Sequence, residues 1–132
     1  MPVSMDIDHE ARLVTAHIEG EAGPIEGIAA LARLIAAGAL PYAKLLDFSY
    51  AKPEEGMRAV RQISNYLGKF VRGKKPGPVA VVTTSEILKE MFAAFDRQMR
   101  VDRPLRIFSD SASARAWLDS LNQVPADDRK TG

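Results

Sequence analysis

The chain has 132 residues, a formal net charge of +1 and no cysteine. A domain of this length can bury a sizeable core without disulfides or metals. The lack of cysteine excludes disulfides, thiolate catalysis and zinc–thiolate sites, and is typical of a reducing compartment. With no signal-peptide pattern and no apolar run of about 20 residues, we expect a cytoplasmic protein without stable membrane insertion.

Two short segments of alternating polarity open the chain. Apolar and polar residues alternate over Val3–Asp8 and again over Leu13–Glu19, a period that is typical of β-strands. The polar residues 9–12 between them predict a β-hairpin.

A helix and a buried strand are predicted next. Pro24 suits the first helical position, and Gly38 suits the end of the helix. Residues Lys44–Ser49 then form a nearly continuous apolar run, as in a central parallel strand. Asp47 interrupts this run, and an ionised carboxylate there is costly unless it is paired or hydrogen-bonded.

Strands and helices continue to alternate after this point. A second helix is expected over 53–72, and the apolar run Val79–Val82 predicts a short central strand. Thr83 and Glu86 stand three residues apart before an apolar stripe, which predicts a capping box at the start of a third helix.

The closing unit combines an apolar strand with an amphipathic helix. The strand Leu105–Phe108 ends in Ser109 and Asp110, either of which suits a helix N-cap. The helix that follows carries the only tryptophan, Trp117. Residues 122–132 are polar and are expected to form a frayed tail.

The predicted order of elements is therefore ββαβαβαβα, in one domain over residues 3–121. Strands that alternate with helices predict an α/β fold with a mixed, mostly parallel five-stranded sheet and four helices on its faces. The hairpin adds one antiparallel strand, which we expect at an edge of the sheet.

Polar side chains gather where the predicted parallel strands end. Ligands of open α/β sheets usually bind beyond these carboxyl ends. The candidate ligand- or partner-binding residues are Asp47, Ser49, Tyr50, Thr83 and Thr84. Helix capping is a competing interpretation for Thr83. Asp47 is the strongest candidate, because capping does not explain a carboxylate inside an apolar strand.

Catalytic, metal and cofactor sites lack their usual residues. Both histidines, His9 and His17, fall in the predicted hairpin. No histidine falls at the strand ends considered above, so a nucleophile there would lack its base. The chain has no cluster at metal-ligand spacing and no glycine-rich nucleotide motif. We therefore expect a non-enzymatic protein without cofactor or metal; a small hydrolase or isomerase using Asp47 as acid or base is the alternative.

Charge is unevenly distributed along the chain. Residues 1–49 hold three basic and seven acidic residues, whereas residues 50–106 hold twelve basic and six acidic residues. A solvated helix surface explains most such runs, but segment 69–75 is also a candidate site for an anionic lipid headgroup. Its basic residues are Lys69, Arg72, Lys74 and Lys75. The basic face is too narrow to predict a nucleic-acid partner.

The closing unit also resembles a known family. The pattern Arg106–Asp110, followed by Ala114–Leu118 with its Ala-x-x-Trp-Leu ending, is similar to the SpoIIAA-like group of the STAS superfamily. That superfamily is named for sulfate transporters and anti-sigma factor antagonists and is related to the Sec14 lipid-binding type. The strands around Leu45–Asp47 and Ala80–Val82 agree with it. The resemblance implies a STAS-like fold and a regulatory module that binds a partner protein or a small, including lipidic, ligand.

One departure narrows what this resemblance implies. Anti-sigma factor antagonists carry an Asp-Ser-Ser-Gly-like phosphorylation segment after the third strand. In this chain Ser49 is the only hydroxyl near that place besides Tyr50, and Gly56 lies too far along. Kinase-regulated control of a sigma factor is therefore not implied.

A homodimer is one of the assemblies that the sequence leaves open.

Overall fold

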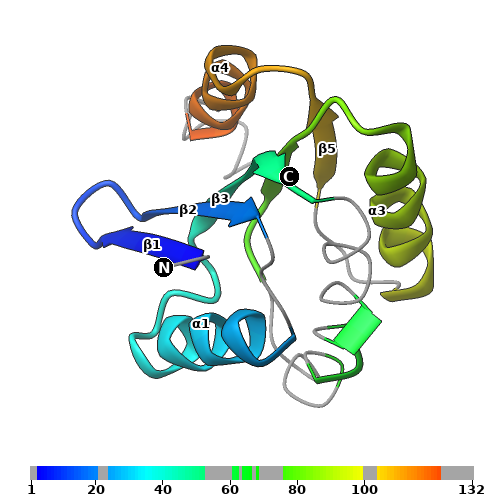
Figure 1. The fold of residues 1–132 in the computed structure, drawn as a ribbon. Helices are drawn as coiled ribbons and strands as arrows, with labels where there is room; N and C mark the ends of the chain where they lie inside the picture. Colours follow the sequence, from blue (N-terminus) through cyan, green and yellow to red (C-terminus); the bar gives the residue numbers. More distant parts are fainter. Residues whose placement is uncertain are drawn as a thin grey trace.

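The computed structural model describes residues 3–20, 24–52, 61–62, 64–66, 68, 76–99 and 104–122. Its strands are β1 (Val3–Asp8), β2 (Leu13–Gly20), β3 (Ala43–Ala51), β4 (Val79–Val82) and β5 (Leu105–Phe108). Its helices are α1 (Pro24–Ala36), α3 (Glu86–Met99) and α4 (Ser111–Asn122). The described residues between 61 and 68 are also helical, so the elements follow the predicted order ββαβαβαβα (Figure 1).

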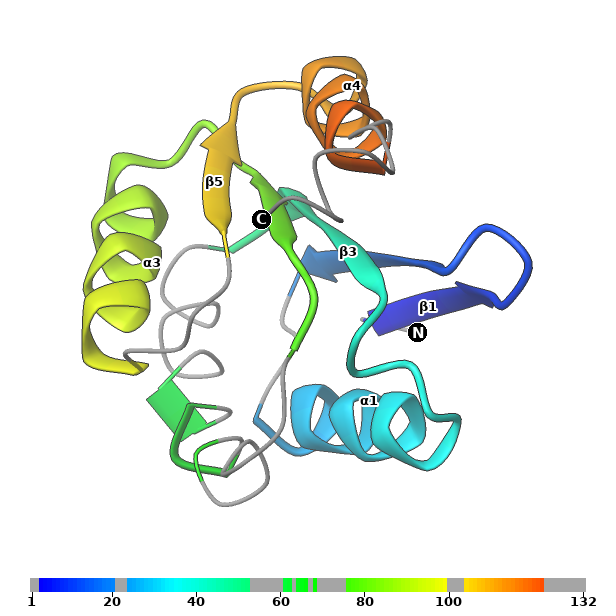
Figure 2. The same ribbon diagram turned by 180° about the vertical axis from the view of Figure 1, so that it is seen from behind.

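The five strands form one sheet in the order in which they occur in the chain, β1-β2-β3-β4-β5. β1 pairs antiparallel with β2 at one edge, and the other three pairs of strands are parallel. When right-handed crossovers move step by step in one direction, their helices fall on the same face of the sheet. Accordingly, α1 and α3 lie on one side and α4, which follows the last strand, lies on the other (Figures 1 and 2).

The alternation of side chains along each strand divides the core between these two faces. On the α1 and α3 face, β2 contributes Val14, Ala16 and Ile18, which pack in the same clusters as Leu34 of α1 and Leu88 of α3. The α4 face holds a third cluster, formed by Leu13, Ala43, Leu45, Ala80, Val82, Ala114 and Leu118. Phe108 and Trp117 pack against this cluster, so the tryptophan anchors α4 to the sheet.

Tyr42 directly precedes β3, at the amino ends of the parallel strands, and contacts two residues from another part of the chain. Its hydroxyl lies 2.8 Å from Nδ1 of His9, and the guanidinium carbon of Arg12 lies 4.8 Å from the centroid of its ring. Both partners come from the turn between β1 and β2, where Arg12 has a φ of 54°. His9 therefore helps to fix the hairpin turn against the residues that precede β3.

A close backbone approach requires glycine at position 77. The N–H of Gly77 donates to the carbonyl of Leu40 over 3.0 Å. A Cβ atom on Gly77 would lie 2.3 Å from the carbonyl oxygens of both Pro41 and Tyr42. These are backbone atoms within a packed edge, so a larger residue at position 77 would force the two segments apart.

Within the described part of the chain, no helix is long and apolar enough to cross a membrane. The predicted frayed tail falls almost wholly outside the described residues, because only Asn122, the last residue of α4, belongs to both.

Candidate functional site

Asp47 lies beside an irregularity in the pairing of β2 with β3. His17 is the register partner of Asp47, and Glu19 is the partner of Tyr50. One residue of β2 therefore stands opposite two residues of β3, which is the arrangement of a β-bulge. Bulges disturb the ladder of backbone hydrogen bonds and redirect the side chains that follow them.

The carboxylate of Asp47 is held by one contact at each oxygen. Its Oδ1 accepts a hydrogen bond of 2.9 Å from the backbone N–H of Ser49, within the bulge. Its Oδ2 lies 3.2 Å from Nδ1 of His17 on the neighbouring strand. Asp47 is only 7% exposed, so these contacts replace the water that the carboxylate gives up.

The balance of these influences keeps Asp47 ionised. Burial, the largest single influence, raises the pKa of the carboxyl group. The side-chain and backbone hydrogen bonds from Ser49, together with the charge interaction and hydrogen bond of His17, lower it by more. The net result is a pKa below the ordinary value of 3.8. A general acid at neutral pH would need the opposite shift, so the lowered pKa argues against Asp47 as a general acid.

The position of His17 corrects the expectation that no strand end supplies a histidine. β2 belongs to the hairpin, but it is also the first parallel strand, so its carboxyl end lies beside that of β3. The side chain of His17 is 50% exposed, and its Nδ1 faces Asp47. The sequence contains no signal for this pairing, because it depends on the lateral register of two strands.

The bulge also determines the face on which Tyr50 lies. Without the extra residue, Tyr50 would share a face with Phe48, which is buried in the cluster on the α3 side. Instead it pairs with Glu19, and the next residue, Ala51, packs against that cluster. Tyr50 therefore lies on the same face as Asp47 and is 76% exposed.

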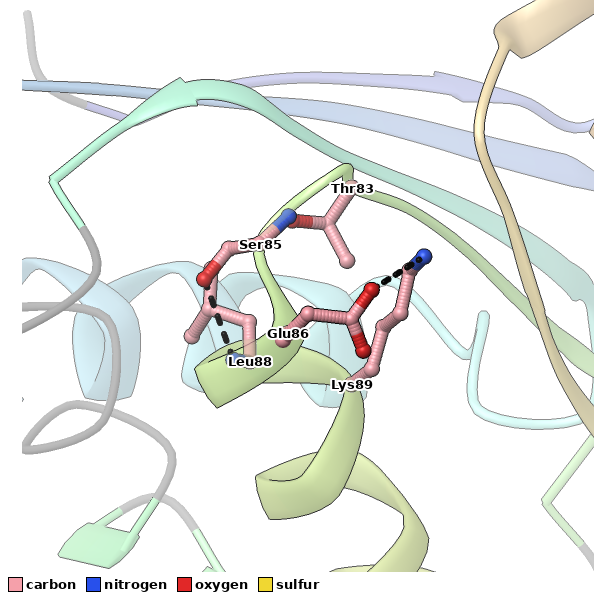
Figure 3. A network of polar contacts seen from close by, with 5 residues as sticks. All are labelled: Thr83, Ser85, Glu86, Leu88 and Lys89. Carbon is pink, nitrogen blue, oxygen red and sulfur yellow. Dashed lines mark hydrogen bonds and ion pairs between the residues drawn. The ribbon is translucent and has the colours of Figure 1, made fainter.

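The hydroxyl groups after β4 serve mainly to start α3 (Figure 3). The N-cap is Ser85, whose Oγ accepts a hydrogen bond of 3.2 Å from the N–H of Leu88. The expected capping box at Thr83 is therefore wrong by two residues. Thr83 is buried, and its Oγ1 accepts a 3.1 Å hydrogen bond from the N–H of Ser85. Thr83 thus helps to hold the backbone of the capping residue, Ser85, in place.

At α4, Asp110 is the N-cap, one of the two residues that the sequence proposed. Its Oδ1 accepts a hydrogen bond of 2.7 Å from the N–H of Ser113, and its Oδ2 accepts one of 3.0 Å from the Ser113 hydroxyl. The backbone and side-chain hydrogen bonds from Ser113 hold the pKa of Asp110 below its usual value.

The predicted binding residues fall at neighbouring strand ends. Asp47 pairs in register with Val82, the residue before Thr83, so the β3 and β4 segments lie side by side. Ser49, Tyr50 and Thr84 are exposed. The four basic residues of the proposed headgroup site, Lys69, Arg72, Lys74 and Lys75, lie outside the described residues. No group of three or more potential metal ligands occurs among the residues that the structure describes.

Comparison with solved structures identifies the architecture. The chain is similar to the crystal structure of an uncharacterized protein of the DUF3478 family with a SpoIIAA-like fold, from Shewanella loihica PV-4. The TM-score is 0.61 at 15% sequence identity, over 88% of this chain and 93% of that one. The fold is SpoIIAA-like. The architecture inferred from the closing strand and helix is thus confirmed, whereas identity this low carries no information about ligand or partner. No family model and no curated protein sequence matches the chain.

Proposed function

We propose that this SpoIIAA-like protein is a non-enzymatic, cytoplasmic binding module that recognises a partner protein at the carboxyl edge of its parallel strands. One observation carries the proposal. The exposed large apolar side chains of the described chain are Ile25, Tyr50 and Ile87, with exposed fractions of 81%, 76% and 49%.

All three residues occur at the same end of the sheet. Ile25 lies in the first turn of α1, the first helix after β2; Tyr50 lies near the end of β3; and Ile87 lies in the first turn of α3, after β4. Isolated exposed apolar residues are ordinary, but three that share one end of the sheet, Tyr50 on the α4 face and Ile25 and Ile87 at the starts of α1 and α3 on the other face, favour an interaction site at that end. Ser49 and Thr84 add exposed polar groups to this edge.

The proposal is tested by affinity capture with the full chain from an extract of its own host. The variants Ile25→Ser, Tyr50→Ser and Ile87→Ser are compared with Arg115→Ser, a matched change on the exposed surface of α4. We expect each edge variant to reduce the captured partner severalfold while Arg115→Ser leaves capture unchanged, with equal circular dichroism throughout.

Native mass spectrometry of the protein purified from that host provides the second readout. A defined increase in mass equal to a protein partner, lost in Tyr50→Ser, supports the proposal. Retention of a small or lipidic molecule, with no protein partner, overturns it in favour of a small-ligand module. Equal capture by all four variants also overturns it.

A further inference from the structure

The α4 face of the sheet is only partly covered. α4 packs on β3, β4 and β5. The side chains of β1 and β2 that point to the same side, beyond the buried Leu13, are exposed or half-buried. On the opposite side of the same two strands, Met5 and Ile7 pack against the cluster that contains Leu34 of α1. One half of the α4 face is therefore open.

This open face is polar, acidic and carries one exposed aromatic ring. We define it by the residues Ser4, Asp6, His17, Glu19, Asp47 and Tyr50. Neither β1 nor β2 contributes a lysine or arginine to it. Of its three carboxylates, only Glu19 stands directly beside the tyrosine, because Asp47 is buried and paired with His17, and Asp6 lies at the level of Thr15.

Two of these groups are placed side by side by the strand register. Glu19 and Tyr50 are direct register partners, and side chains of directly opposed residues point to the same side of the sheet. A carboxylate next to an accessible aromatic ring suits a cation, because an ammonium or guanidinium group forms charge-assisted hydrogen bonds with the first and a cation–π contact with the second. An anionic ligand beside Tyr50 would be repelled by the Glu19 carboxylate.

We infer that the open face binds a basic segment of the partner protein, with a lysine or arginine side chain held between Glu19 and Tyr50. The inference rests on the proposed function and adds the chemistry of the partner. A protein segment is favoured over a small enclosed cation because Tyr50 is 76% exposed on an open sheet surface. The exposed Ile25 and Ile87 supply apolar contacts at the adjoining edge.

Asp47 acts as a positioning residue in this arrangement. Its carboxylate holds the N–H of Ser49, which belongs to the bulge that turns Tyr50 onto the open face. It also faces His17, the neighbour of Glu19 on the same side of β2. Loss of Asp47 is therefore expected to weaken binding by misplacing Tyr50, although Asp47 itself is almost fully covered.

The test uses an acetylated and amidated nonapeptide of alternating arginine and glycine, with a glutamate–glycine nonapeptide as the charge-reversed probe. Binding is followed by ¹H–¹⁵N NMR titration of the full chain. We expect the basic peptide alone to shift the amide signals of Glu19, Ser49 and Tyr50, with affinity falling severalfold as salt is added.

Matched variants separate this face from general acidity. Glu19→Gln and Tyr50→Leu should each lower the affinity about twofold to fivefold, since exposed ion pairs and cation–π contacts are individually weak. Glu90→Gln, at an exposed position of α3, should leave it unchanged. Equal weakening by Glu90→Gln, or binding of the acidic peptide with the same affinity, would overturn the inference.

The two proposals fail in different ways. If the edge variants lose the captured partner but the basic peptide leaves the Glu19 and Tyr50 signals unchanged, the proposed function is supported and the inference of a basic partner segment is wrong. If the edge variants keep the captured partner, the proposed function fails, and this inference fails with it.

Discussion

Nδ1 of His17 lies 3.2 Å from Oδ2 of Asp47; the two residues are 30 apart in the chain and lie on adjacent parallel strands. The contact joins the N-terminal hairpin to the strand that follows the first crossover. Together with the hydrogen bond from the backbone N–H of Ser49 to Oδ1, this contact stabilises a charged carboxylate that is only 7% exposed. Asp47 thus contributes both to the stability of the sheet and to the shape of the proposed binding site.

The lowered pKa of Asp47 predicts a specific dependence of stability on pH. A carboxyl group whose pKa is lower in the folded state stabilises the protein above its unfolded value, close to 3.8, and this contribution is lost as the pH falls through the folded value. Wild-type protein should therefore lose stability below about pH 4, and Asp47→Asn should lose less over the same interval. Urea unfolding between pH 7 and pH 2 measures both.

At pH 7 the Asp47→Asn variant should be less stable than wild type by about 1–2 kcal/mol, because a hydrogen bond to a charged acceptor becomes a weaker neutral one. Glu90→Gln, which removes an exposed carboxylate from α3, is the control and should change little. Parallel pH profiles for wild type and Asp47→Asn would show that the pKa of Asp47 is not lowered by folding.

The N-cap of α3 gives a second prediction about stability. Ser85→Ala removes the acceptor of the Leu88 N–H and should destabilise the protein by about 1 kcal/mol. Thr84→Ala changes an exposed neighbouring hydroxyl and should be close to neutral. Thermal unfolding of both variants decides between Ser85 and a capping box at Thr83, since the latter predicts no loss for Ser85→Ala.

Most of the architecture could be predicted from the sequence, because strong local signals specify it. The alternation over Val3–Asp8 and the apolar runs Val79–Val82 and Leu105–Phe108 give strands with the predicted bounds. The edge position of the antiparallel strand and the SpoIIAA-like fold were also predicted correctly. The cap of α3 was misplaced because Thr83 and Ser85 both have side chains that suit helix caps.

The candidate site could be predicted only in part. Asp47 was found because a carboxylate in an apolar run has a local energetic cost that the sequence reveals. The roles of His17 and Glu19 depend on the register between β2 and β3, which is set by contacts distant in sequence. The bulge at Ser49 has no distinctive residue pattern, so the side of the sheet on which Tyr50 lies could not be predicted.

Tyr42 gives a third prediction, at the amino ends of the parallel strands. Tyr42→Phe keeps the ring that lies against Arg12 but removes the hydroxyl that contacts His9. The loss of one hydrogen bond should cost about 1 kcal/mol in urea unfolding. In the Tyr42→Phe background, the further change His9→Phe should cost little, because the contact that it would break is already lost; the two single variants and the double variant form a double-mutant cycle. Additive losses would indicate that the two side chains act independently.

The close approach at Gly77 gives the largest expected effect. Gly77→Ala would place a methyl group 2.3 Å from two backbone carbonyl oxygens, of Pro41 and Tyr42, neither of which can rotate away as a side chain would. Overpacking of this kind should destabilise the protein by about 3 kcal/mol. Gly68→Ala is the matched control, because a Cβ atom at position 68 would meet no atom within 4 Å and Gly68 lies in a helical segment. Alanine there should stabilise the protein by about 0.5–1 kcal/mol. Urea unfolding of the pair measures both signs, and a Gly77→Ala variant as stable as wild type would contradict the close packing of these backbone segments.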